Sequence, residues 1–132
     1  MELVVADSSF YIHELRQKRQ PFLEMEELGD AVEWATTGMV VLEVCRGFAA
    51  PSVRDEFLAR YASMIFLPTN NRVWEDAARI AWQLDRKGNS IPAQDIIIAA
   101  HCLQHDARLL TNDGHFAAVP GLKLAFALDE LT

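Results

Sequence analysis

Short apolar segments rich in β-branched residues recur along the chain, and longer segments with helical spacing separate them. The first covers 2–7 ("ELVVAD"), and similar segments follow at 63–68 ("SMIFLP"), 107–113 ("ARLLTND") and 122–128 ("LKLAFAL"). A strand without polar alternation is typical of a parallel sheet that helices cover on both faces. The pattern therefore predicts a three-layer α/β domain with a mainly parallel, five-stranded sheet.

The spacing of apolar residues predicts the connecting helices. The first is expected at 8–18, and the second at 21–34, where Pro21 suits a first turn. A brief strand at 35–38 leads into 39–50, which we interpret as a helix, although its β-branched residues leave a strand as the alternative. Further helices are predicted at 52–62, 72–88 and 93–105.

The length of 132 residues fits one domain spanning 1–132. No apolar run is long enough to cross a membrane, and the N-terminus lacks the features of a signal peptide, so we expect a cytoplasmic protein. The net charge of -7 argues against binding nucleic acid through a broad basic surface. Contact with nucleic acid would need a local site, such as a metal ion held by carboxylates.

Four acidic residues are predicted to meet at the carboxyl edge of the sheet. Asp7 and Asp113 end strands, Asp95 begins the helix before the fourth strand, and Glu43 lies about one turn into the helix after the second. Singly, each has an ordinary explanation as a cap, a helix-dipole partner, a turn residue or a partner of Arg46. Together they would repel, by roughly 4 kcal/mol for two carboxylates about 4 Å apart, so a divalent cation is expected.

Polar residues beside these acids are candidates to orient the carboxylates or a metal-bound water, namely Ser8, Ser9, Thr111 and Asn112. Each also has an ordinary explanation as a cap or turn residue. His101 and His105 are spaced to bind zinc from one helix face, but no third ligand is evident and a structural role is favoured. His13 and His115 have no identifiable partner in the sequence.

The segments that carry the four acids resemble the PIN-domain nucleases, and within them the VapC-type toxins of toxin–antitoxin pairs. The similar segments are "VVADSSFYI", "VVLEVCRG", "KGNSIPAQDIIIAA" and "LLTNDGHFAAVPGL", of which the last two are the more specific. The resemblance implies the strand order 3-2-1-4-5. It also implies that Asp7, Glu43, Asp95 and Asp113 form a catalytic site that binds metal.

The same resemblance implies Mg²⁺-dependent hydrolysis of RNA, with Mn²⁺ as a possible substitute. Arg46, Arg86 and Lys87 are candidate contacts to the RNA backbone, although solvated surface charges are the more ordinary interpretation. A PIN-like module that binds protein or RNA without catalysis is the alternative function.

Two protein partners are also implied by the resemblance, a cognate antitoxin and a second copy of the chain. The antitoxin would cover the acidic cleft. An apolar docking surface on the first two helices would involve Phe10, Tyr11, Phe22 and Met25, with core packing as the more ordinary alternative for each.

Overall fold

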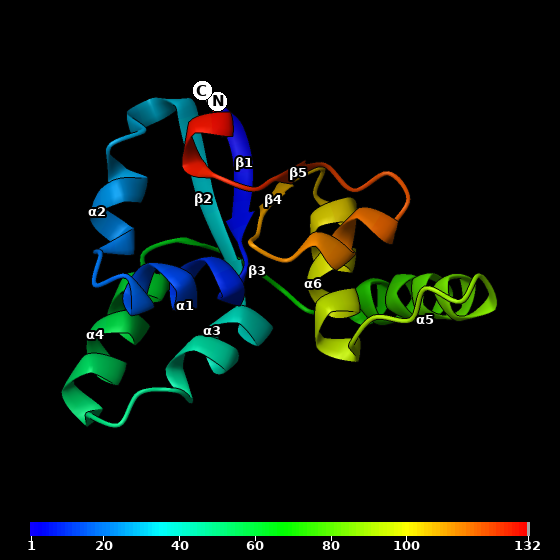
Figure 1. Cartoon of the computed structure of the whole chain (residues 1–132), viewed down its shortest axis with the longest axis horizontal. Coiled ribbons are helices and arrows are strands. Elements are labelled where there is room, and N and C mark those ends of the chain that lie inside the picture. The colour runs from blue at the N-terminus through cyan, green and yellow to red at the C-terminus, as the bar shows by residue number, and fades with distance from the viewer. Residues whose placement is uncertain (132) are drawn as a thin grey trace.

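The sheet has five strands, all parallel, in the predicted order β3-β2-β1-β4-β5 (Figure 1). This computed structural model describes residues 1–131, so Thr132, the last residue of the predicted domain, lies outside the described residues. The strands are β1 (Glu2–Ala6), β2 (Val32–Thr37), β3 (Ile65–Leu67), β4 (Arg108–Leu110) and β5 (Leu124–Ala125).

Helices flank the strands on two sides. They are α1 (Ser8–Arg16), α2 (Pro21–Glu26), α3 (Gly38–Cys45), α4 (Pro51–Ala62), α5 (Asn71–Arg86) and α6 (Ala93–Gln104). In Figure 1, α1, α2 and α4 lie left of the strands and α5 and α6 lie right, while α3 packs against α1, α4 and α6. Within residues 1–131, no helix is long and apolar enough to cross a membrane.

Strand β1 forms the centre of the core. Its residues Val4, Val5 and Ala6 are completely buried, because β2 and β4 pair with its two edges and helices cover both faces. This burial explains why the segment lacks polar alternation. The stripe on α5 (Val73, Ala77, Ile80 and Leu84) is buried as its helical spacing predicts.

The predicted second helix at 21–34 is wrong beyond its first two turns. Helix α2 ends at Glu26, and Gly29, with a left-handed φ of 57°, begins the short 3₁₀-helix η1 (Gly29–Ala31) that leads into β2. Val32 follows Leu28 at helical spacing by coincidence, since it is the first residue of β2. The predicted strand at 35–38 therefore begins three residues too late.

The helical interpretation of 39–50 is confirmed over α3, and the strand alternative is wrong there. Thr37 ends β2 and also caps this helix, because its Oγ1 accepts a hydrogen bond of 3.3 Å from the Val40 N–H. The predicted fifth strand at 122–128 is much shorter than expected. β5 is an edge strand that pairs only with the short β4, and the 3₁₀-helix η3 (Leu128–Leu131) follows it.

Candidate active site

The four acids come together at the carboxyl edge of the sheet. Ala6 pairs with Leu110, and the Asp7 N–H donates to the Leu110 carbonyl at 2.8 Å, so the ends of β1 and β4 lie side by side. Carboxylate oxygens of Asp7, Glu43 and Asp95 lie within 4.8 Å of one another. Together with Asp113, these residues line one pocket of about 440 Å³.

Asp7 occupies the N-cap position of α1, yet its side chain accepts no hydrogen bond from the helix backbone. Its Oδ2 instead accepts hydrogen bonds from Ser9 Oγ at 2.8 Å and from Thr111 Oγ1 at 2.9 Å. The side chain is almost fully buried, with 2% of the residue exposed. A carboxylate buried in this way is held by two hydroxyl groups rather than used as a helix cap.

The other two predicted neighbours also contact the acids or their partners. Ser8 Oγ lies 3.3 Å from Glu43 Oε1 and 3.5 Å from Asp7 Oδ1, so it joins two of the acids. Asn112 contributes through its backbone, because its N–H donates to Ser9 Oγ at 3.0 Å. The same hydroxyl groups thus position both the acids and the loop after β4.

Proximity and burial shift the acidities of two carboxyl groups. Burial raises the pKa of Glu43, the charges of Asp7 and Asp95 raise it further, and Ser8 and Arg46 oppose the shift only in part. Burial also raises the pKa of Asp95, while a hydrogen bond from His115 lowers it and Asp7 raises it. In both residues, the nearby negative charges add to the larger effect of burial on the pKa.

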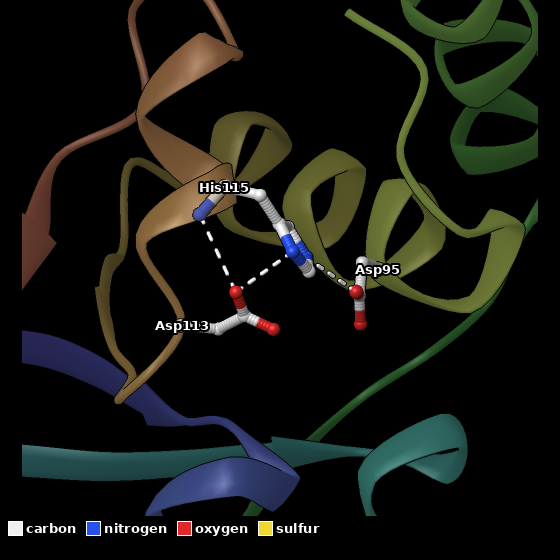
Figure 2. Close-up of side chains that lie close together, drawn as sticks. All are labelled: Asp95, Asp113 and His115. Atoms are coloured by element: carbon white, nitrogen blue, oxygen red, sulfur yellow. Dashed lines mark hydrogen bonds and ion pairs between the residues drawn. The ribbon is translucent and has the colours of Figure 1, made fainter.

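His115 joins this site, although the sequence alone offers no identifiable partner for it. Figure 2 shows its ring between two carboxylates, with Nε2 2.6 Å from Asp95 Oδ2 and Nδ1 2.7 Å from Asp113 Oδ1. Asp113 is the N-cap of the 3₁₀-helix η2 (Gly114–Ala118), and its Oδ1 also accepts from the His115 N–H at 3.3 Å. The sequence does hold one signal for this contact, since His115 lies two residues after the capping residue Asp113.

Two basic side chains line the acidic pocket, but they are not those singled out from the sequence. His13 and Arg16, both exposed on α1, lie at its wall. Among the predicted contacts, Arg46 is near enough to Glu43 to lower its pKa, and the Arg86 guanidinium stacks 4.7 Å from the centroid of the Trp82 ring. Arg46, Arg86 and Lys87 are not among the residues that line the pocket.

Two further sequence interpretations are resolved by burial and hydrogen bonding. His101 is fully buried, and its ring nitrogens lie 2.9 Å from Thr69 Oγ1 and 2.8 Å from the Ile97 carbonyl, which is a structural role. Of the four residues considered for an apolar docking surface, Phe10, Tyr11 and Met25 are buried in the core and only Phe22 is partly exposed.

The donor set of the pocket fits a hard divalent cation. Three carboxylates supply one oxygen each within 4.8 Å, and Asp95 belongs also to a second group of donors with Asp113 and His115. An octahedral Mg²⁺ ion with bonds of about 2.1 Å places its ligands roughly 3 to 4 Å apart, so only small side-chain shifts are needed. Burial and then the charges of Asp7 and Asp95 raise the pKa of Glu43, and a cation would offset the part that is due to those charges.

Comparisons with known proteins agree with this architecture. VapBC2 from Rickettsia felis, bound to a DNA fragment from its promoter, has a structure with a TM-score of 0.78 at 19% identity over 93% of this chain and 97% of that chain. DNA-bound VapBC from Salmonella typhimurium has a TM-score of 0.78 at 20% identity, over 95% and 98% of the two chains.

A third similar structure is VapBC-5 from Mycobacterium tuberculosis, a member of the VapBC family of toxin–antitoxin systems. Its TM-score is 0.65 at 25% identity, over 95% of this chain and 97% of that chain. A comparison with curated protein sequences gives no significant match. The PIN domain profile matches residues 4–122, which include all four acids, so the chain belongs to the PIN domain family.

Proposed function

We propose that this protein is a Mg²⁺-dependent endoribonuclease and the toxin of a toxin–antitoxin pair. The observation that supports this most is the convergence of Asp7, Glu43, Asp95 and Asp113 on one pocket, with Asp7 buried and held by two hydroxyl groups. Such a concentration of charge opposes folding unless a cation compensates it. The similarity to VapBC structures adds support for the toxin assignment.

Asp7, Glu43 and Asp95 would hold the ion, with Asp113 as a further ligand. When bound, Mg²⁺ supplies positive charge to a phosphate oxygen and lowers the pKa of a water molecule. Ser9 and Thr111 fix the Asp7 carboxylate, so this ligand needs little rearrangement. Glu43 is partly exposed and has a raised pKa, which suits a group that accepts a proton from water.

The RNA backbone would be held by Arg16 and His13, since these two side chains line the same pocket as the acids. Contact through a few basic groups and a metal ion is consistent with the net charge of -7, which disfavours broad electrostatic binding. Arg46, close to Glu43, is a further candidate contact.

Cleavage of a labelled single-stranded RNA with and without Mg²⁺ tests the proposal. We expect Asp7→Asn and Asp95→Asn to reduce cleavage at least about 100-fold. Asp55→Asn is the matched control, because Asp55 is an exposed residue on α4 that pairs with Arg54. Undiminished cleavage by both site variants would refute the proposal, whereas Mg²⁺ binding without cleavage by the wild type would favour an inert binding module.

We further propose a cognate antitoxin as partner, a homodimer as the state of the isolated chain and the cytoplasm as its location. A basic side chain of the antitoxin would complement the acidic pocket. The partly exposed Phe22 lines a separate pocket of about 150 Å³ with Leu23 and Phe57, which offers apolar contacts. Light scattering that finds only monomer at every concentration would refute the dimer.

A further inference from the structure

We propose that an apolar side pocket next to the four acids binds a base of the RNA, beside the phosphate that is cleaved. This inference rests on the proposed function, because it concerns how the same site holds its substrate. The side pocket has a volume of about 360 Å³ and is lined by residues of α1, of α3 and of the turn after α3. Its apolar walls are formed by Ile12, Leu15, Val44, Gly47 and Phe48.

The side pocket is continuous with the acidic pocket. Ile12, Arg16 and Glu43 line both of them. The apolar pocket around Phe22 and the one around Trp82 have no lining residue in common with the acidic pocket. An RNA chain with a phosphate at the acids therefore has the side pocket directly beside it, within reach of the base of a neighbouring nucleotide.

The walls of the side pocket suit a flat apolar group that carries a phosphate at one end. Phe48 supplies a partly buried aromatic ring, which is held in place by the ring of Phe57 with 4.6 Å between the centroids. Ile12 and Leu15 add aliphatic surface. At the boundary with the acids, the exposed Arg16 offers positive charge to an anion. A nucleotide combines these features, because its base has an apolar face and its phosphate is negative.

The charge of the chain favours a contact of this kind. With a net charge of -7, the protein does not attract RNA through a broad basic surface. The acidic pocket itself is lined by two basic side chains, His13 and Arg16. Stacking of a base on an aromatic ring adds affinity that does not depend on charge. The side pocket would therefore supply affinity for a nucleotide beyond the affinity for its phosphate.

Removal of single bases from the RNA tests this inference. In Mg²⁺, the KM of a short single-stranded RNA is compared with that of copies in which one nucleotide after another lacks its base. With the wild type, the copy that lacks a base next to the cleaved phosphate should have a KM about 10-fold higher. Phe48→Leu removes the stacking ring and keeps an apolar side chain. It should raise the KM of the intact RNA by a similar factor and make cleavage insensitive to that missing base.

Gly47→Leu tests the same site by filling it. A methyl group at Gly47 meets the Val44 carbonyl oxygen at 3.5 Å, which is an ordinary contact, and the position needs no positive φ. Leucine there should narrow the side pocket and have the same effect on KM as Phe48→Leu. The matched controls lie on α5, where Trp74→Leu removes an exposed ring and Ala78→Leu adds bulk at an exposed position. Both controls should behave as the wild type does.

A binding measurement gives a second result that does not depend on cleavage. Titration of the wild type with adenosine 5′-monophosphate should shift the nuclear magnetic resonance signals of the Phe48 ring. Ribose 5-phosphate, which lacks the base, should not shift them. The response of Phe48 to the nucleotide should be lost in Gly47→Leu, and a folded spectrum of that variant shows that the loss is local.

The outcomes separate this inference from the proposed function. An equal KM for the intact RNA and for every copy with a missing base would overturn the base site and leave the proposed ribonuclease intact. Weaker binding of the antitoxin to Gly47→Leu, with no change in KM, would make the side pocket a protein docking site and would also overturn the inference. If the wild type does not cleave RNA, the proposed function fails, and the nucleotide titration alone decides whether the side pocket binds a base.

Discussion

Replacing Glu43 by glutamine is expected to stabilise the metal-free fold. The Glu43 carboxylate lies within 4.8 Å of oxygens of Asp7 and Asp95, where like charges repel by about 3 kcal/mol per pair at an effective dielectric of 20. Because the pocket is open to solvent, water and salt reduce this repulsion to about 1 kcal/mol per pair. With two neighbours the gain is about 2 kcal/mol, and the amide oxygen of glutamine can still accept from Ser8.

The gain should depend on pH. Burial, followed by the charges of Asp7 and Asp95, raises the pKa of Glu43 in the folded chain above its ordinary value of 4.5. The folded chain therefore keeps this proton to higher pH than the unfolded chain, and wild-type stability falls as pH rises through that window. Above the window the glutamine variant shows its full advantage, and below pH 4.5 the advantage disappears.

Urea denaturation in EDTA at pH 8 and at a pH below 4.5 measures this effect. A gain of about 2 kcal/mol moves the urea midpoint by about 1 M when the slope is about 2 kcal/mol/M. The control Glu75→Gln alters an exposed residue of α5 and should shift stability by less than about 0.5 kcal/mol. If Glu43→Gln is no more stable than the wild type at pH 8, charge repulsion in the pocket is refuted.

Three further predictions concern the same structure. Thr111→Val should lower the free energy of unfolding by about 1 to 3 kcal/mol in thermal denaturation, because Thr111 Oγ1 donates to Asp7 and accepts from the Asp113 N–H. Thr111→Ser should keep most of this stability. A valine variant as stable as the wild type would show that these bonds do not stabilise the fold. Gly29→Ala should lower the free energy of unfolding in urea by about 1 kcal/mol. The cause would be the positive φ of Gly29, because open space surrounds the position and an added methyl group meets no atom. Gly38→Ala, which also meets no atom but has no positive φ, should be nearly neutral. Mg²⁺ at ten times its Kd should raise the free energy of unfolding of the wild type by about 1.4 kcal/mol. The same concentration should not change the stability of Asp7→Asn. Equal stabilisation of both proteins would exclude Asp7 as a ligand.

The sheet order and the meeting of the acids were accessible from the sequence because they follow from simple rules. Apolar strands without alternation predict a parallel sheet, and parallel strands bring their carboxyl ends to one edge. Asp7 and Asp113 were placed by that rule alone. Asp95 and Glu43 required only the direction of the helices next to the strands, which is fixed once the strands are parallel.

The start of β2 and the role of His115 depend on information that local spacing does not hold. Val32 continues the apolar spacing of α2, so that spacing does not show that the helix ends at Glu26, three residues before the left-handed Gly29. The contact between His115 and Asp95 joins residues twenty positions apart through the packing of η2 near α6. Arg16 also lines the pocket because of tertiary packing, since its position depends on how α1 lies against the edge of the sheet.

The hydrogen bond from Thr111 to Asp7 joins positions 104 apart in the sequence. During synthesis, Asp7 leaves the ribosome long before Thr111 has been added, and the two meet only after β4 inserts beside β1. A nascent chain therefore cannot assemble the pocket until β4 and Thr111 have been synthesised. For the ribonuclease proposed above, this order of assembly would delay the hazard to the ribosome that makes it.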